Sequence, residues 1–132
     1  MNVGNDNYKT DEWIREIFDL DNWFDPCPLR RTYGVDGLKI QWGQRTFCNP
    51  PYSNPLPWVK KAIAEINSNN SHMVVMLLRM DTSTEWFKLL QNAGAKFLWI
   101  NGRLKFNTGK PANFPSMLVI LNEKENKKEI GE

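Results

Sequence analysis

The fold of this chain is decided by the stretch Met73-Val74-Val75-Met76-Leu77-Leu78, in which every residue is apolar. A continuous apolar run of this length is typical of a strand that is buried on both faces of a sheet. The next segment, Thr82-Ser83-Thr84-Glu85, matches a capping box and predicts a helix that ends before a C-cap glycine, Gly94. This part of the chain therefore predicts a central strand followed by a helix.

Helical patterns also precede this strand. Apolar residues at helical spacing predict a helix over residues 57–67. Its polar side chains are expected to face water: Lys60, Lys61 and Glu65. A second pattern, with acidic residues in its first turn, predicts a short helix over residues 10–19.

Shorter apolar segments predict the remaining strands, at residues 22–24, 39–42, 45–48, 97–100 and 117–121. Strands that alternate with helices predict an α/β domain of three layers around a mostly parallel sheet. Ligands of such sheets bind at the carboxyl ends of the strands. The loops that follow the strands are therefore the first candidates for a functional site: 25–29, 49–54 and 79–84.

The composition is that of one folded domain. The chain has 132 residues, 41% of them hydrophobic, with 17 Lys and Arg against 15 Asp and Glu. This excludes a mainly disordered chain, and the net charge of +2 is too weak to identify a nucleic-acid binder. No apolar run approaches the roughly 18 residues of a membrane span, so we expect a soluble, cytoplasmic protein.

Two cysteines and one histidine give no metal-ligand spacing, so we expect no metal site. We expect one domain over residues 1–122 and a polar tail over residues 123–132, where charged residues of both signs gather.

The most specific motif is Asn49-Pro50-Pro51-Tyr52, which follows the predicted strand at 45–48. An exocyclic amine such as adenine N6 is a poor nucleophile, because its lone pair is delocalised into the ring. The Asn49 side-chain carbonyl and the Pro50 backbone carbonyl are two acceptors that could hold its hydrogens and expose the lone pair. The prolines fix the loop, and Tyr52 offers a face on which a flipped-out base could stack.

A Pro-Pro-Tyr sequence on its own is often only a loop, or a ligand of a proline-recognition domain. Here it follows a predicted apolar strand and precedes a predicted helix, in a chain whose pattern predicts an α/β fold. This context favours the catalytic interpretation.

The chain as a whole resembles the phage-type, Dam-like DNA adenine N6-methyltransferases. The matches follow the family's order at Thr10, Trp13, 24–29, 36–38, Trp42, 47–53, 58–59, 61–62, 74–78, 82–87, 102–106 and 111–117. The resemblance implies a minimal Rossmann-like fold and S-adenosylmethionine as cofactor. It also implies methyl transfer to adenine N6 in double-stranded DNA, by a methyltransferase domain over residues 1–122.

The resemblance also assigns roles to individual residues. It implies that the catalytic motif is Asn49, Pro50, Pro51 and Tyr52, and that the cofactor-binding positions are Thr10, Asp25, Pro26, Cys27, Asp36 and Asn49. Many methyltransferases have a Gly-x-Gly turn after the first strand, whereas this chain has Asp25-Pro26-Cys27-Pro28, as the phage-type family does. Thr10 is followed by Asp11 where the family usually has proline.

Candidate DNA contacts are the cations Arg30, Arg31, Arg103 and Lys105 together with Ser53. A chain of this length has few residues beyond a methyltransferase core, so we expect recognition of a short target by short loops. The resemblance suggests GATC or a related site. A homodimer would supply further DNA surface and would match the symmetry of a palindromic target.

Other conspicuous residues receive structural interpretations. Four tryptophans occupy apolar periodic positions and are expected in the core: Trp13, Trp58, Trp86 and Trp99. His72 is assigned no catalytic role. Cys27 and Cys48 lie at the carboxyl ends of neighbouring strands, so we expect them close in space. They would stay reduced in an ordinary cytosol, whereas a thermophilic intracellular setting would permit a disulfide between them.

Two alternative functions stay open from the sequence. One is an N-methyltransferase that acts on RNA or protein, because Asn-Pro-Pro-Tyr also serves those substrates. The other is a noncatalytic nucleic-acid-binding protein that has kept the fold, for which the missing glycines are the only support.

Overall fold

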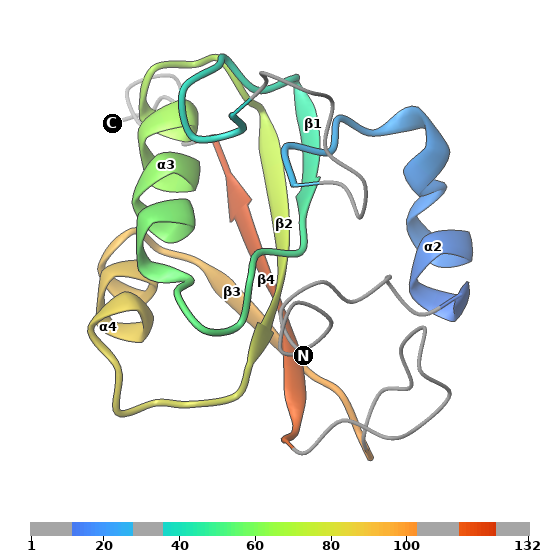
Figure 1. Cartoon of the computed structure of the whole chain (residues 1–132), viewed down its shortest axis with the longest axis vertical. Coiled ribbons are helices and arrows are strands. Elements are labelled where there is room, and N and C mark those ends of the chain that lie inside the picture. Colours follow the sequence, from blue (N-terminus) through green and yellow to red (C-terminus); the bar gives the residue numbers. More distant parts are fainter. Residues whose placement is uncertain (1–11, 28–35, 103–113, 124–132) are drawn as a thin grey trace, which may run out of the picture.

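The apolar run at 73–78 forms β2 (Met73–Arg79), an inner strand of a four-stranded sheet. The computed structural model describes residues 12–27, 36–102 and 114–123 (Figure 1). β1 (Arg45–Cys48) pairs with β2 in parallel, and β4 (Ser116–Asn122) pairs with it on the other side in the antiparallel sense. β3 (Lys96–Trp99) pairs antiparallel with β4. β1, β2 and β3 therefore share one direction, and β4 opposes them.

Helices cover both faces of this sheet. α3 (Leu56–Asn67) and α4 (Glu85–Asn92) lie on one face, and α2 (Glu12–Phe18) lies on the other (Figure 1). A 3-10 turn, η1 (Leu20–Asn22), follows α2. The three-layer α/β prediction is confirmed. None of the described helices is long and apolar enough to cross a membrane.

Successive side chains of β2 enter two separate cores. Val74, Met76 and Leu78 pack with the helices α3 and α4, whereas Val75 and Leu77 pack on the α2 side. All five are fully buried. Because burying one such side chain contributes about 1.5–3 kcal/mol, a strand that is apolar throughout is stable only between two covered faces.

The N-terminus of α4 lies two residues after its predicted cap. Thr84 is the N-cap, and its hydroxyl accepts the backbone N–H of Phe87 at 3.2 Å. The predicted capping box at Thr82 is wrong, because the preceding residues form a turn of their own. In that turn the carboxylate of Asp81 accepts the N–H and the hydroxyl of Ser83, at 3.1 and 2.6 Å.

The C-terminus of α4 agrees with the prediction. Gly94 has a φ of +80°, a conformation that residues with a Cβ rarely adopt. Its backbone N–H donates to Gln91 O, and the Ala95 N–H donates to Leu90 O, both at 3.0 Å. These two bonds form a Schellman motif and use carbonyls that the helix end would otherwise leave without partners.

Two predicted strands differ from the structure. The segment 39–42 is not a strand, because the backbone N–H of Trp42 bonds to a side chain of α3 and not to a neighbouring strand. The segment 22–24 is reduced to one residue, Phe24, which bridges in parallel to Thr46 of β1. Asn22 belongs to η1, and Trp23 is its C-cap.

Two of the four tryptophans expected in the core are exposed. Trp58 and Trp86 are buried, as predicted, but 39% of Trp13 and 57% of Trp99 is exposed. The prediction fails for Trp13 because α2 covers only part of its face of the sheet. It fails for Trp99 because this residue lies on β3, the last strand at that edge of the described sheet, where its ring stacks on Phe97 at 6.0 Å.

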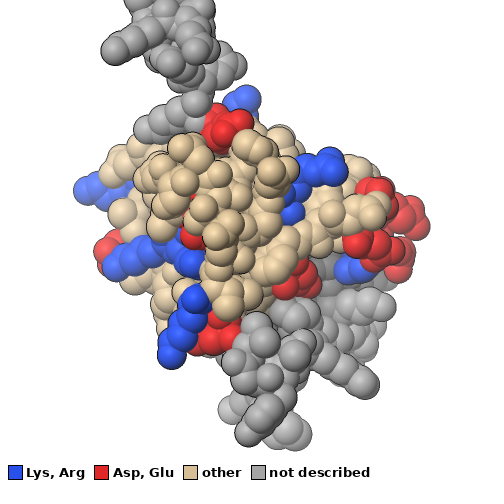
Figure 2. All heavy atoms as spheres, turned by 90° about the horizontal axis from the view of Figure 1, so that it is seen from above, with Lys and Arg blue, Asp and Glu red and all other residues tan. Residues whose placement is uncertain are grey.

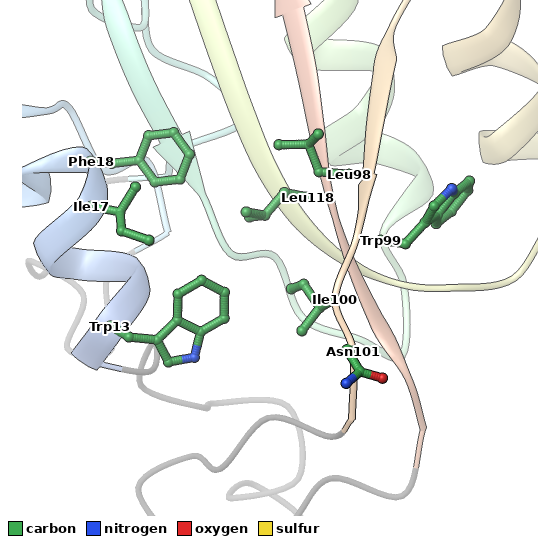
Figure 3. A pocket seen from close by; sticks show the side chains of 8 residues that line it. All are labelled: Trp13, Ile17, Phe18, Leu98, Trp99, Ile100, Asn101 and Leu118. Atoms are coloured by element: carbon green, nitrogen blue, oxygen red, sulfur yellow. The ribbon is translucent and has the colours of Figure 1, made fainter.

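An apolar groove of about 340 Å³ remains between α2 and the β3 side of the sheet (Figure 3). Its walls include Trp13, Ile17 and Phe18 on one side and Leu98, Ile100 and Leu118 on the other. In Figure 3 the Trp99 side chain points away from that of Leu98, as successive residues of a strand do.

Candidate active site

Three strands end at one edge of the sheet, and the described part of the chain places several candidate residues in loops at this carboxyl edge. Register places the last residues of the parallel strands there: Cys48 of β1, Arg79 of β2 and Trp99 of β3. The segment 49–55 leaves β1 at this edge and enters α3. The motif singled out from the sequence is therefore at the position where α/β sheets bind ligands.

The motif loop is short and turns sharply. Asn49 is half-buried and Pro50 is buried. The Pro51 carbonyl accepts the backbone N–H of Asn54 at 3.2 Å, which closes a turn before α3 begins. Because both prolines have fixed φ angles, the loop loses little conformational freedom when it orders around a substrate.

Phe24 brings the first candidate cofactor loop to the same edge. Its N–H donates to Arg45 O and its carbonyl accepts the Phe47 N–H, both at 2.9 Å. Phe24 therefore lies beside β1 and runs parallel to it. Asp25 leaves the sheet on the same side as the segment 49–55.

The carboxylate of Asp25 closes a turn by accepting the Cys27 N–H at 2.9 Å. Although Asp25 reaches the surface, desolvation by the atoms around its carboxylate raises its pKa. The hydrogen bond from Cys27 and the charge of Arg15 lower the pKa and only partly offset this effect. An incompletely compensated carboxylate would be stabilised by a cationic partner.

The Asp36 turn packs directly on this first loop. Asp36 accepts two N–H groups at 2.9 Å, from Leu38 at its carboxylate and from Lys39 at its carbonyl. A Cβ on Gly37 would lie 1.9 Å from the Pro26 carbonyl oxygen, so only glycine permits this approach. The fold thus brings together two candidate cofactor segments that are separated along the chain.

Tyr52 is held in the core on the α2 side. Only 9% of the residue is exposed, and its ring meets that of Phe114 edge-on at a centroid distance of 4.9 Å. It shares a buried cluster with Ile14 and Phe47. In this arrangement the ring anchors the motif loop, and its contact with Phe114 would have to open before a base could stack on it.

Ser53 is exposed beside the motif, at the surface of the carboxyl edge. The other predicted contacts lie outside the described residues: Thr10 for the cofactor, and Arg30, Arg31, Arg103 and Lys105 for DNA.

Neither Cys27 nor Cys48 forms a disulfide in this structure. Cys48 is buried, and this burial raises the pKa of its thiol well above the usual range. Negative charge on Cys27 or Asp25 would raise that pKa further. Cys27 packs against the core cluster that contains Cys48.

One expected surface residue is in fact buried. Glu65 was predicted to face water, but only 5% of it is exposed, and its carboxylate accepts the backbone N–H of Trp42 at 2.6 Å. A signal in the sequence could have shown this, because Glu65 lies three residues after Ala62 and next to Ile66 on the apolar stripe of the helix.

The edge of the sheet opposite the candidate site carries charged side chains of both signs. His72 pairs with Glu123 there, with 2.9 Å between Nδ1 and the carboxylate. Seen from this side, the described surface carries basic and acidic side chains interspersed with uncharged ones (Figure 2). Such a mixed surface offers no extended field of one sign to attract a polyanion.

Matches to known proteins cover most of the length of this chain. A model of the DNA N-6-adenine-methyltransferase (Dam) family matches residues 19–131. The chain belongs to the Dam family. Haemophilus phage HP1 has a protein named DNA N-6-adenine-methyltransferase that is 32% identical over 139 residues, which covers 90% of this chain and 80% of the phage protein.

A second relative of this Dam-family chain carries the same name in Escherichia phage T1. It is 42% identical over 109 residues, and the match covers 65% of this chain and 45% of the T1 protein. A crystal structure from Pyrococcus horikoshii, described as that of an RNA methyltransferase, has a TM-score of 0.48 at 14% identity. That match covers 70% of this chain and 48% of the archaeal one.

Proposed function

We propose that this Dam-family chain methylates adenine N6 in double-stranded DNA, with S-adenosylmethionine as methyl donor. The observation that carries the proposal is the position of Asn49-Pro50-Pro51-Tyr52. The motif follows β1 directly at the carboxyl edge, beside the loop that begins at Asp25.

The motif supplies two hydrogen-bond acceptors for the target amine. We assign the Asn49 side-chain oxygen and the Pro50 carbonyl to the two hydrogens of adenine N6. Two acceptors favour a tetrahedral nitrogen and direct its lone pair away from the ring. Asn49 is half-buried, so part of this residue is open to a substrate. No strong base is required, because the methylated amine becomes acidic and can release its proton to water.

The residues of the first two loops fit a cationic cofactor. When bound, S-adenosylmethionine supplies an electrophilic methyl group on a positively charged sulfur. Desolvation of the Asp25 carboxylate raises its pKa, so a cationic partner would stabilise its charged form. We propose that Asp25, Pro26 and Cys27 hold the cofactor together with Asp36, and that Thr10 and Asn49 also contact it.

DNA would approach the carboxyl edge. Ser53 is exposed there, and we propose that it contacts the DNA together with Arg30, Arg31, Arg103 and Lys105. We further propose a short target, with GATC the sequence that the family resemblance suggests. Activity on DNA would place the enzyme in the cytoplasm, that of the host if a phage encodes it.

We also propose that the protein acts as a homodimer. The support is the apolar groove between α2 and β3, together with the position of β3 at one edge of the described sheet. The occupant that we assign to this face is a second copy of the chain, because an apolar wall stabilises a protein contact better than a contact to charged DNA.

The function is tested by offering labelled S-adenosylmethionine with DNA, RNA or protein and locating the label by mass spectrometry. We expect N6-methyladenine in DNA. Asn49→Ala should abolish transfer while the protein still binds the cofactor, because the proposed contacts from Asp25 and Asp36 remain. Asn54→Ala, a change at an exposed residue of the same loop, should leave turnover near wild type.

Other outcomes of this experiment correspond to the two alternative functions. Label only in RNA or protein would identify the N-methyltransferase of another substrate class. A protein that binds DNA and neither binds nor consumes S-adenosylmethionine would be the noncatalytic form. Full turnover by Asn49→Ala would contradict the assigned mechanism.

A further inference from the structure

Glu65 on α3 is the only charged side chain that is buried in the described part of the chain. Its carboxylate accepts three hydrogen bonds: from the Trp42 backbone N–H at 2.6 Å, from Asn70 Nδ2 at 3.2 Å and from Lys61 Nζ at 3.3 Å. A buried charge is costly unless donors surround it. The shortest of its bonds reaches into a loop 23 residues away along the chain.

Trp42 also contacts Gly37 and Trp58. Its indole Nε1 donates to the Gly37 carbonyl at 2.7 Å, and its ring stacks on Trp58 of α3 at 6.5 Å with an interplanar angle of 25°. The residue is buried. Segment 36–43 has no strand partners among the described residues, and Trp42 is a main contact that holds it against α3.

Gly37 connects Trp42 to the two candidate cofactor loops. Its backbone lies against the Pro26 carbonyl, and a Cβ there would also come within 3.0 Å of the Trp58 ring. Asp36 is the preceding residue, and its turn is closed by Leu38 and Lys39. The place of Asp36 relative to Pro26 therefore depends on the hydrogen bond that holds Gly37.

We propose that Glu65, Trp42 and Gly37 form a brace that sets the spacing between the two cofactor loops and thereby the affinity for S-adenosylmethionine. This inference rests on the proposed function. The brace residues are positioning residues: Glu65 and Trp42 are buried and act through the loops that they hold. The acceptors on Asn49 and Pro50 belong to a different loop, so the brace should govern cofactor binding and not turnover.

The test is Trp42→Phe, which keeps an aromatic ring and removes the indole N–H. We expect the Kd for S-adenosylmethionine, measured by calorimetry, to rise about fivefold or more, because a buried carbonyl loses its donor. The KM for the cofactor should rise in parallel, and kcat at saturation should change by less than about twofold. Trp86→Phe on α4 is the matched control and should change neither constant.

A conservative pair tests the other end of the brace. Glu65→Gln keeps an oxygen that can accept the Trp42 N–H, so it should bind the cofactor nearly as well as wild type. Glu65→Ala removes the acceptor and should weaken binding as Trp42→Phe does. A variant that lowers kcat alone, or a Trp86→Phe loss equal to that of Trp42→Phe, would overturn the brace.

A measurement on the wild-type protein covers the case in which the variants do not fold. Hydrogen exchange of the Trp42 amide should slow by about tenfold or more when S-adenosylmethionine saturates the protein, since the cofactor would stabilise the loops that the brace holds. Unchanged exchange in a protein that binds the cofactor overturns the inference. A wild type that binds no S-adenosylmethionine contradicts the proposed function itself.

Discussion

Asp25 is the residue at which the proposed cofactor contact would cost stability. Its carboxylate is partly desolvated, and this raises its pKa in the folded protein. A raised pKa in the folded state means that ionised Asp25 destabilises the fold as pH rises through that pKa, and the cost is fully present at neutral pH. Such uncompensated groups are typical of binding sites, where a ligand supplies the missing partner.

We expect Asp25→Asn to raise Tm at pH 7, because an amide has no charge to desolvate and its oxygen can still accept the Cys27 N–H. The Kd for S-adenosylmethionine should rise about tenfold, as expected for the loss of a charged hydrogen-bond partner. Thermal unfolding and calorimetry on the same samples measure both effects. A variant that is less stable than wild type would show that the raised pKa was wrongly interpreted.

The pKa of Glu65 is shifted in the opposite direction to that of Asp25. Burial raises its pKa, but the bonds from Trp42, Asn70 and Lys61 together outweigh burial and leave the pKa below the ordinary value of 4.5. A lowered pKa in the folded state means that ionised Glu65 stabilises the fold above pH 4.5, and that this stability is lost as pH falls through the folded pKa.

At neutral pH, Glu65→Gln should therefore unfold more readily than wild type, because its amide group cannot accept bonds from Lys61 and Asn70. Below about pH 4.5 the difference in free energy of unfolding should shrink, since wild-type Glu65 becomes protonated. Denaturant titrations at several pH values measure this difference. A gap that stayed constant from pH 7 to pH 3 would show that ionised Glu65 does not stabilise the fold.

At the scale of elements, α4 can be tested through its N-cap. Thr84→Ala removes the hydroxyl that accepts the Phe87 N–H and should lower the free energy of unfolding by about 1 kcal/mol. Thr82→Ala is the matched control and should change it by only a few tenths, because Thr82 is exposed in the preceding turn. If urea titrations showed that both variants lose the same free energy of unfolding, Thr84 would not be the dominant N-cap and Thr82 would share that role.

Elements that are defined by local pattern could be predicted from the sequence. The apolar run of β2, the helical spacing of α3 and the glycine after α4 each express a rule that acts within one element. The segment 39–42 could not be predicted in this way. Its conformation depends on Glu65, which lies more than twenty residues away, so no pattern within the segment records it.

The candidate site, too, could be predicted from the sequence only where local pattern determines it. The place of Asn49-Pro50-Pro51-Tyr52 at a strand end follows from the order of elements, and the structure has β1 ending at Cys48. Tyr52 differs, since its ring is buried against Phe114, a residue more than sixty positions later. Contacts between distant segments decide whether a side chain faces a ligand or a core, and periodicity within a segment does not encode them.

At the scale of the whole molecule, the two faces of the sheet are unequally covered. α3 and α4 lie over one face, whereas α2 lies over part of the other (Figure 1). Trp13 and Leu98 consequently remain exposed, as does Ile17, of which 67% is accessible. Ile100 lines the groove between α2 and β3, and it follows the last residue of β3 at the carboxyl edge. A partner in the groove would therefore lie beside the candidate site.

A second copy in this groove would bring two sites together, as a palindromic target requires. Light scattering with and without DNA should then give the mass of two chains. Leu98→Asp should give the mass of one, because a charge in an apolar interface would be buried without a partner. Asn122→Asp, which adds the same charge at the opposite edge of the sheet, should leave the dimer intact. A wild type that stays monomeric with DNA contradicts dimerisation, and a dimeric Leu98→Asp variant would place the interface elsewhere.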